Sequence, residues 1–214
     1  MVELIQQYNN FFSIPPKSIL EIGSRDGNDA LELREYFNIP EEKTYIVEPH
    51  PDCRRLIKEN IPNCRLYEYA VALENGTAKF NAINKYGEDW ADLGLIGMSS
   101  LLNRTHGNIG NENWIKVKTI TGEGLFDLIG EEEYDLVKID VEGYSYEVLK
   151  SMGKQISKIK IMHLEVEHYP FWIGQKLYPE IAELLTSFKF EECYRFDYNY
   201  TLEQVQSDVI WVRR

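Results

Sequence analysis

The stretch Ser18-Ile-Leu-Glu-Ile-Gly-Ser-Arg-Asp-Gly-Asn28 carries the pattern that decides the fold. Its first five residues form a short apolar run that is typical of a buried strand. Gly23 and Gly27 then supply the backbone freedom that a tight turn needs. From Asn28 to Phe37, apolar residues recur at helical spacing. The stretch therefore predicts a strand, a glycine turn and a helix, which together form the repeating unit of α/β proteins.

Outward from this unit, short apolar runs alternate with helical stretches along the chain. Further strands are predicted at 44–47, 65–71, 135–139, 158–166, 190–196 and 208–212. Helices are predicted at 52–60, 145–152 and 178–188. Strands that alternate with helices form a parallel sheet covered on both faces, and the last two strands are expected to be antiparallel neighbours. The predicted fold class is a doubly wound, mostly parallel, Rossmann-like α/β sheet of about seven strands.

A single domain is expected over residues 1–214, because no repeat, linker-like run or charged tail divides the chain. The stretch 81–114 departs from the alternation, since it holds several Gly and Asn residues, two Trp residues and Met98-Ser-Ser100. Long loops inside a compact domain are usually lids or binding segments. The stretch is therefore either such a loop or an insertion with a short helix of its own.

The composition excludes several classes of partner. The chain of 214 residues has 23 Lys and Arg against 35 Asp and Glu, which gives a formal net charge of −12. Binders of nucleic acid or of anionic membranes normally carry a basic face, so neither is an expected partner. The three cysteines show no C-x-x-C spacing, which indicates a reducing compartment. With no signal peptide and no membrane-spanning apolar run, the sequence predicts a cytoplasmic protein, and it is compatible with a homo-oligomer.

The glycine turn discriminates between nucleotide cofactors. A dinucleotide motif G-x-G-x-x-G that starts at Gly23 would need glycines where Arg25 and Asn28 stand. The turn instead reads E-x-G-x-x-x-G, and Glu48 follows 21 residues after its second glycine, at the end of the second predicted strand. A carboxylate at that place accepts hydrogen bonds from the ribose hydroxyls of a nucleoside. An acidic first strand suits a cationic or zwitterionic cofactor, and S-adenosylmethionine, with its sulfonium and amino-acid tail, meets this demand.

Three motifs lie at the predicted strand ends: Glu21-Ile-Gly-Ser-Arg-Asp-Gly27, Val47-Glu-Pro-His-Pro51 and Val137-Lys-Ile-Asp-Val-Glu-Gly143. Together with Ala70-Val71, Gly76, Ser99-Ser100 and Glu165, they resemble the FkbM-type family of S-adenosylmethionine-dependent methyltransferases. The similarity covers about residues 17–212, and the K-I-D-V-E-G string is its most specific part. The resemblance implies the class I methyltransferase fold. It also implies O-methylation of a hydroxyl on a sugar, a polysaccharide or a natural product.

The turn, the strand ends and the resemblance together predict the residues that bind the cofactor. These residues are Glu21, Gly23, Ser24, Arg25, Gly27, Glu48, Pro49, Ala70, Ser100 and Asp140. Ser99, Trp90 and the rest of the 81–114 stretch are expected to face either the cofactor or the acceptor. An aromatic ring there could stack on a sugar face, or it could simply anchor the loop by packing.

Charged residues in the fourth and fifth predicted strands are candidates for catalysis. Charge is expensive in a buried parallel strand unless it is paired, yet Lys138, Asp140, His163 and Glu165 stand there. If the two strands are neighbours, these side chains converge near the methyl group. Glu165 or His163 could then act as the general base, with Lys138 orienting the acceptor oxygen or stabilising an alkoxide. The alternative is a Lys138–Glu165 ion pair that only stabilises the sheet.

The same strand ends also carry candidate ligands for a divalent metal. Asp140, Glu165 and Glu167 offer oxygen ligands that could hold Mg²⁺ against the substrate hydroxyls. The sequence has no dense Asp/Asn cluster there, so no metal site is predicted and Mg²⁺ is not a favoured cofactor.

The favoured function is therefore a methyltransferase that uses S-adenosylmethionine to O-methylate a hydroxyl on a sugar, glycan or similar small polar acceptor. Two alternatives stay open. One is a nucleoside-binding scaffold that lacks catalysis. The other is an NAD-dependent oxidoreductase that uses the Tyr146-x-x-x-Lys150 pair, although the glycine turn disagrees with NAD.

Overall fold

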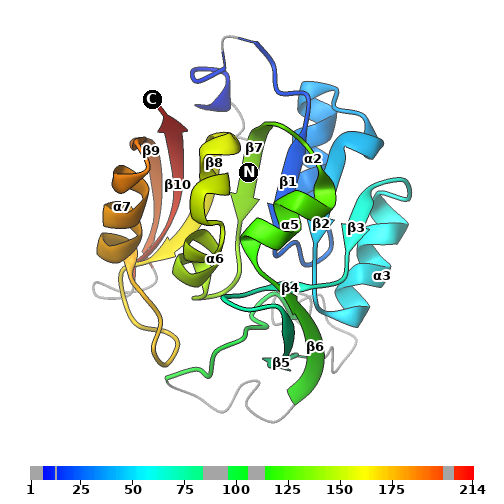
Figure 1. Cartoon of the computed structure of the whole chain (residues 1–214), viewed down its shortest axis with the longest axis vertical. Coiled ribbons are helices and arrows are strands. Elements are labelled where there is room, and N and C mark those ends of the chain that lie inside the picture. The colour runs from blue at the N-terminus through cyan, green and yellow to red at the C-terminus, as the bar shows by residue number, and fades with distance from the viewer. Residues whose placement is uncertain (1–6, 13, 84–95, 106–113, 200–204) are drawn as a thin grey trace.

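The computed structural model describes residues 7–12, 14–83, 96–105, 114–199 and 205–214 (Figure 1). Its strands are β1 Ile19–Ile22, β2 Thr44–Val47, β3 Arg65–Tyr67, β4 Ala70–Val71, β5 Gly76–Asn81, β6 Trp114–Ile120, β7 Tyr134–Ile139, β8 Ile159–Glu167, β9 Phe190–Asn199 and β10 Val205–Arg213. Its helices are α2 Asn28–Phe37, α3 Pro51–Asn60, α5 Gly122–Ile129, α6 Ser145–Ser151 and α7 Tyr178–Ser187, with short 3₁₀ turns η1 Glu41–Lys43 and η2 Gly153–Lys158.

The large sheet has seven strands in the order β3-β2-β1-β7-β8-β10-β9. β1 pairs in parallel with β2 and β7, and β7 pairs in parallel with β8. β10 lies between β8 and β9 and runs antiparallel to both. The predicted doubly wound, mostly parallel sheet with antiparallel C-terminal strands is therefore confirmed.

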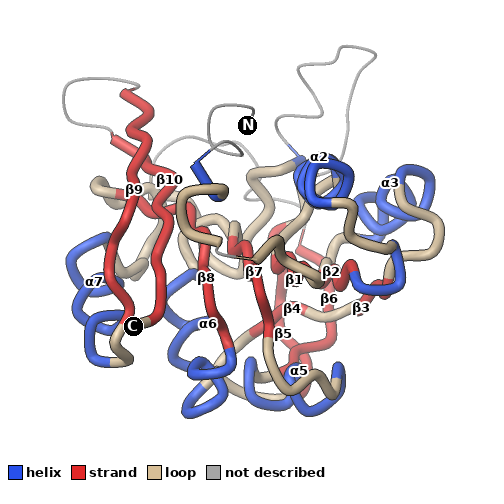
Figure 2. The backbone as a smooth tube through the Cα atoms, turned by 90° about the horizontal axis from the view of Figure 1, so that it is seen from above, coloured by secondary structure: helices blue, strands red, loops and turns tan. Residues whose placement is uncertain are grey.

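Helices cover both faces of this sheet. α2 and α3 lie on one face, and α5, α6 and α7 lie on the other (Figure 2). Successive side chains of a strand point to opposite faces. In β1, Leu20 therefore packs in the core that contains Leu125 of α5, whereas Ile19 packs in the core that contains Leu33 of α2. Because both faces of β1 are covered, all four of its residues are buried, and its carboxyl end is the part that opens to a ligand.

The third predicted strand, 65–71, is wrong as a single element. β3 ends at Tyr67, and the chain then leaves the large sheet, so that Ala70 and Val71 form β4 in a second sheet with the order β4-β6-β5. The strands β5 and β6 and the helix α5 were not predicted from the sequence. In Figure 1 the small sheet lies below the carboxyl ends of the central strands, so it supplies side chains to the same edge.

Part of the predicted 81–114 loop lies outside the described residues, and Trp90 falls in that part. The described part, 96–105, is tied both to the small sheet and to the loop that follows β8. Asn81 bridges to Ser100 through the backbone, and Arg104 bridges to Trp172. Thr105 N–H also donates to the carbonyl oxygen of Phe171 (2.9 Å). The segment thus spans from the small sheet to the loop that follows β8.

Across the described ranges, no helix combines the length and the apolar character that crossing a membrane requires.

Candidate functional site

The glycine turn after β1 brings two backbone segments unusually close. Gly23 has a φ of +77°, and a Cβ built on it would lie 1.8 Å from the carbonyl oxygen of Asp140. Asp140 N–H in turn donates to Ile22 O (2.9 Å). Only glycine fits such an approach with this left-handed conformation. Gly27, with a φ of +81°, is the N-cap of α2, so both glycines serve the turn as the sequence predicts.

Glu48 at the end of β2 holds this turn in place. Ser24 N–H and Arg25 N–H donate to its Oε2 atom at 3.0 and 3.1 Å, and His50 N–H donates to its Oε1 atom at 2.8 Å. Burial raises the pKa of Glu48, and the three backbone hydrogen bonds oppose that rise. The carboxylate also lines the cavity described next.

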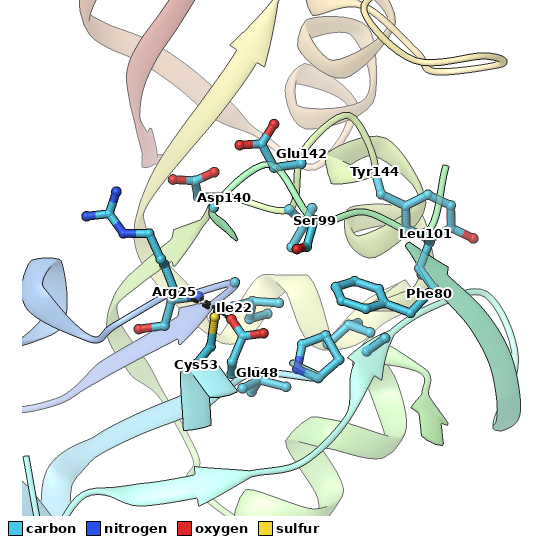
Figure 3. Close-up of a pocket in the computed structure, with 18 of the residues that line it drawn as sticks. Ile22, Arg25, Glu48, Cys53, Phe80, Ser99, Leu101, Asp140, Glu142 and Tyr144 are labelled. Carbon is cyan, nitrogen blue, oxygen red and sulfur yellow. Dashed lines mark hydrogen bonds between the residues drawn. The ribbon is translucent and has the colours of Figure 1, made fainter. Parts of the chain in front are cut away.

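A cavity lies at the carboxyl ends of β1, β2 and β7 (Figure 3). One part is lined by the glycine turn and by Glu48. A second part is apolar and contains Val71, Phe80 and Leu101, while a third part carries the carboxylates of Asp140, Glu142 and Glu165. Figure 3 shows Phe80 and Leu101 on the opposite side of the cavity from Arg25.

Of the ten residues predicted to bind the cofactor, seven line the cavity, and they come from four segments of the chain. They are Gly23, Ser24, Arg25, Glu48, Pro49, Ala70 and Asp140. Glu21 lies in β1 and Gly27 is the N-cap of α2, and neither is among the residues that line the cavity. Ser99 lines the cavity, whereas Ser100 is fully buried and its hydroxyl donates to Glu142 O (2.7 Å) and accepts from Leu102 N–H (3.0 Å). Ser100 therefore ties the 96–105 segment to the loop after β7.

Lys138 lines the cavity but is already bound by three carboxylates. Its side chain is 4% exposed, and Nζ lies 2.9 Å from Asp29, 3.1 Å from Asp140 and 3.6 Å from Glu21. Burial lowers the pKa of Lys138, but the carboxylates of Asp140, Asp29 and Glu21 outweigh it and hold that pKa well above its usual value. The alternative Lys138–Glu165 ion pair is not among the ion pairs that Lys138 forms in the described structure.

Two carboxyl groups that share Lys138, those of Glu21 and Asp29, have pKa values shifted in opposite directions. Burial is the largest effect on Glu21 and raises its pKa to about 8, although Lys138 and the Ser24 hydroxyl, which donates to its carboxylate, both favour the charged form. Asp29 is more exposed, and Lys138 lowers its pKa despite partial burial. A cation shared in this way holds Asp140 in place at the cavity wall.

The structure places His163 outside the cavity, against the prediction that it converges with Lys138 and Glu165. The ring is fully buried, with Nδ1 2.5 Å from the Tyr8 hydroxyl and Nε2 2.8 Å from Asp208. His163 pairs in register with Lys138 across β7 and β8, but it lies two residues before Glu165 in β8 and is not among the residues that line the cavity. With both ring nitrogens occupied, the geometry does not support a role for His163 as the base.

Glu165 does reach the cavity, and it lies beside Asp140 as predicted. Gln206 of β10 donates to its Oε1 atom. Burial and then the charges of Asp140 and Glu142 raise the pKa of Glu165 well above its usual value. Oxygen atoms of Asp140, Glu142 and Glu165 all lie within 4.8 Å of one another. This group, called the acidic cluster below, is the most charged feature of the cavity.

In the apolar wall of the cavity, Phe80 was not predicted, whereas Leu101 belongs to the 81–114 stretch that was expected to face the cofactor or the acceptor. Phe80 comes from β5 and Leu101 from the 96–105 segment, and neither stands at the end of a predicted strand. The alternation of buried and exposed residues in β6, where Val117 and Thr119 are buried between exposed lysines, was the signal that could have revealed the small sheet.

The sequence profile of the methyltransferase FkbM domain matches residues 21–196. The chain belongs to this family. The match spans every strand and loop that builds the cavity, from Glu21 of β1 to Glu165 of β8. The resemblance seen in the three strand-end motifs is therefore confirmed.

One similar protein is the 2-O-methyltransferase NoeI of Sinorhizobium fredii (strain NBRC 101917 / NGR234). It is 26% identical over 189 residues, which are 82% of this chain and 73% of that protein. Two solved structures are similar in fold. Methyltransferase FkbM from Methylobacillus flagellatus KT matches with a TM-score of 0.54 and 10% identity, over 91% of this chain and 44% of that one.

The second is magnesium protoporphyrin IX methyltransferase from Synechocystis PCC 6803, crystallised with bound SAM. It matches with a TM-score of 0.54 and 10% identity, over 100% of this chain and 77% of that chain. At such low identity these two likenesses bear on the fold alone, and they agree with a class I methyltransferase fold for this FkbM-type chain. The chain spans less than half of the FkbM protein from Methylobacillus flagellatus.

Proposed function

We propose that the protein uses S-adenosylmethionine to methylate a hydroxyl group on a sugar, glycan or similar small polar acceptor. The observation that carries the proposal is one continuous cavity that joins the glycine turn and Glu48 to the carboxylates of Asp140 and Glu165. Membership of the FkbM family and the similarity to a 2-O-methyltransferase support the reaction type.

The lining of the cavity fits the parts of this cofactor. Val71, Phe80 and Leu101 form an apolar slot of the kind that takes a purine ring. A carboxylate has about four acceptor positions, and backbone amides use three of those on Glu48. The position that is left, on Oε1, can accept from a ribose hydroxyl. Arg25, at the other end of the lining, would pair with the carboxylate of the amino-acid tail.

Bound S-adenosylmethionine supplies an electrophilic methyl group on a sulfonium. The acceptor hydroxyl is a poor nucleophile until its proton is removed, and a positioned base contributes roughly 10²–10⁴-fold. Glu165 is the predicted base that lies in the cavity, and Gln206 orients its carboxylate. Lys138 acts by holding Asp140, because its ammonium is already shared among three carboxylates.

Cofactor binding is tested by isothermal titration with S-adenosylmethionine, S-adenosylhomocysteine and NAD. The first two should bind and NAD should not. Glu48→Gln removes a charged acceptor of three amides, and hydrogen bonds to charged groups contribute about 1.5–3 kcal/mol, so affinity should fall about 10–150-fold. Glu59→Gln, in an exposed pair with Arg55 on α3, is the matched control and should change nothing.

Methyl transfer is tested with radiolabelled cofactor and a panel of oligosaccharides, with Glu165→Gln as the variant. Transfer that survives in Glu165→Gln would remove Glu165 as the base. Cofactor binding without transfer to any acceptor would favour the scaffold alternative. Binding of NAD alone would overturn the proposal and revive the oxidoreductase.

A further inference from the structure

We propose that the acidic cluster of Asp140, Glu142 and Glu165 is a binding site for a divalent cation. The three residues come from adjacent strand ends, since Asp140 and Glu142 follow β7 and Glu165 lies in β8. Each offers one carboxylate oxygen, and these oxygens lie within 4.8 Å of one another. Calcium–oxygen bonds are about 2.3–2.6 Å long, so ligands on opposite sides of one ion are about 4.6–5.2 Å apart. The three oxygens can therefore share one ion.

Glu142 supplies the ligand that the sequence did not reveal. The sequence alone offers Asp140, Glu165 and Glu167 as oxygen ligands, without the dense Asp/Asn cluster that would predict a site. In the structure Glu142 turns toward the same space as Asp140 (Figure 3), and the Ser100 hydroxyl holds the Glu142 carbonyl from behind. The loop after β7 thus presents two carboxylates to one point.

Glu167 is an independent sign that a positive charge belongs here. Its side chain is only 1% exposed, and Gly143 N–H, in the loop that carries Glu142, donates to its carboxylate. Its Oε2 atom has no hydrogen-bond partner among the residues that the structure describes. Glu167 stands two residues after Glu165 in β8, so the two side chains lie on the same face of the strand, and the charge of Glu167 acts on both Glu142 and Glu165. A buried carboxylate without a partner is costly, and a nearby cation would offset that cost.

Within the described part of the chain, the nearby cations do not neutralise the four carboxylates of Asp140, Glu142, Glu165 and Glu167. Lys138 is already divided among Glu21, Asp29 and Asp140. The Arg104 guanidinium lies over the Trp172 ring, 5.3 Å from its centroid. It acts on Glu142 only at longer range, since the ion pairs formed among the described residues do not include these two. Among the residues that the structure describes, the one ion pair formed by these four carboxylates is therefore that between Asp140 and Lys138.

The role of the ion in the reaction rests on the proposed function. A divalent cation binds acceptor hydroxyls and lowers their pKa, and a sugar offers neighbouring hydroxyls for two such contacts. A carboxylate that binds the ion through one oxygen keeps its second oxygen, so Glu165 can still receive the acceptor proton. The charge of the cluster also favours neutral or cationic acceptors over phosphorylated ones.

The test is a titration of the chelator-treated full chain with Mn²⁺ in the absence of cofactor. Binding is measured as the decrease in the electron paramagnetic resonance signal of free Mn²⁺. One Mn²⁺ per chain is expected, with Mg²⁺ and Ca²⁺ competing. Changes in residues that merely surround a metal lower affinity by about 10–100-fold, so Glu142→Gln should lower it at least tenfold. Glu133→Gln, at an exposed pair with Lys160, is the control and should bind as the wild type does.

Thermal unfolding of the metal-free variants establishes that they fold. If Glu142→Gln does not fold, Glu167→Gln replaces it in the Mn²⁺ titration. Absence of Mn²⁺ binding, or binding that survives both Glu142→Gln and Glu165→Gln, overturns the site. Because cofactor titration is done without metal, the two proposals fail separately. Cofactor binding without Mn²⁺ binding refutes only the cation site, and Mn²⁺ binding without cofactor binding refutes only the proposed function.

Discussion

Substitution of Gly23 by alanine tests the close approach that shapes the cofactor end of the cavity. The new Cβ would lie 1.8 Å from Asp140 O and 2.8 Å from Asp140 C, both of them backbone atoms. No rotation of a side chain relieves such a contact, so the end of β1 must separate from the loop after β7. We expect a destabilised protein whose Asp140 is displaced from the cavity wall.

The cost has two parts. A non-glycine residue with a left-handed φ costs about 1–2 kcal/mol, and an overpacked contact costs about 1–3 kcal/mol more. Alanine also restricts the unfolded chain, which returns about 0.4–1 kcal/mol. The free energy of unfolding should therefore fall by about 1–5 kcal/mol, a large share of the 5–15 kcal/mol that is usual for a folded domain.

Gly130→Ala is the matched control. Gly130 ends α5 with a φ of +78°, almost the same as the +77° of Gly23, yet a Cβ there meets nothing within 4 Å. The control therefore carries the conformational cost without the clash. Urea unfolding followed by circular dichroism measures both variants, and Gly23→Ala should lose about 1–3 kcal/mol more than Gly130→Ala.

Equal losses of stability in the two variants would refute the reasoning, because they would mean that the contact with Asp140 costs nothing. Titration with S-adenosylmethionine adds a second readout. Gly23→Ala should bind the cofactor weakly even where it is fully folded, whereas Gly130→Ala should bind it as the wild type does.

Three further predictions concern the buried charges. Burial raises the pKa of Glu21 to about 8, so the folded protein holds a proton that the unfolded chain releases near pH 4.5. The free energy of unfolding should therefore fall as the pH rises from about 4.5 to about 8. Urea unfolding at about pH 5 and about pH 8 measures this slope, and Glu21→Gln should flatten it. Lys138→Met leaves the carboxylates of Asp29 and Asp140 without their shared cation and should cost about 3–5 kcal/mol, less at low pH, and a loss that does not shrink on acidification would contradict the ion cluster. Tyr8→Phe leaves Nδ1 of His163 unpaired and should cost about 1–3 kcal/mol while cofactor affinity stays unchanged; a fall in affinity would connect His163 to the cavity after all.

The strands of the large sheet could be predicted because a local sequence pattern marks most of them. Each parallel strand is a short apolar run followed by a helical stretch, and the glycine turn marks which strand end opens to a ligand. The small sheet could not be predicted in the same way. β5 gains its strand geometry by pairing with β6, and its Phe80 pairs with Ile115 across a long intervening stretch. Nothing within 65–71 indicates that the chain changes sheets after Tyr67.

The candidate site shows the same division. The positions of Glu48 and Asp140 follow from strand ends, which a sequence reveals. His163 and Glu165 were correctly placed on one face of β8, but two residues along a strand span about 6–7 Å. That distance separates a residue at the cavity from one buried beneath it. The partner of His163 is Tyr8, from the start of the chain, and no local pattern predicts that contact.

The position of β10 also bears on how the chain folds while it is being synthesised. β10 is translated after β8 and β9, yet it lies between them and pairs with both. Until β10 leaves the ribosome, β8 has a free edge and β9 has no neighbour in the sheet, and free strand edges invite association. Tyr8 also cannot complete its packing until β10 has been synthesised, because it lies in the core that contains Ile210 of β10. The core around Tyr8 is thus completed only after β10 has emerged, about 200 residues later in the chain, and until then the edge of β8 stays open to association.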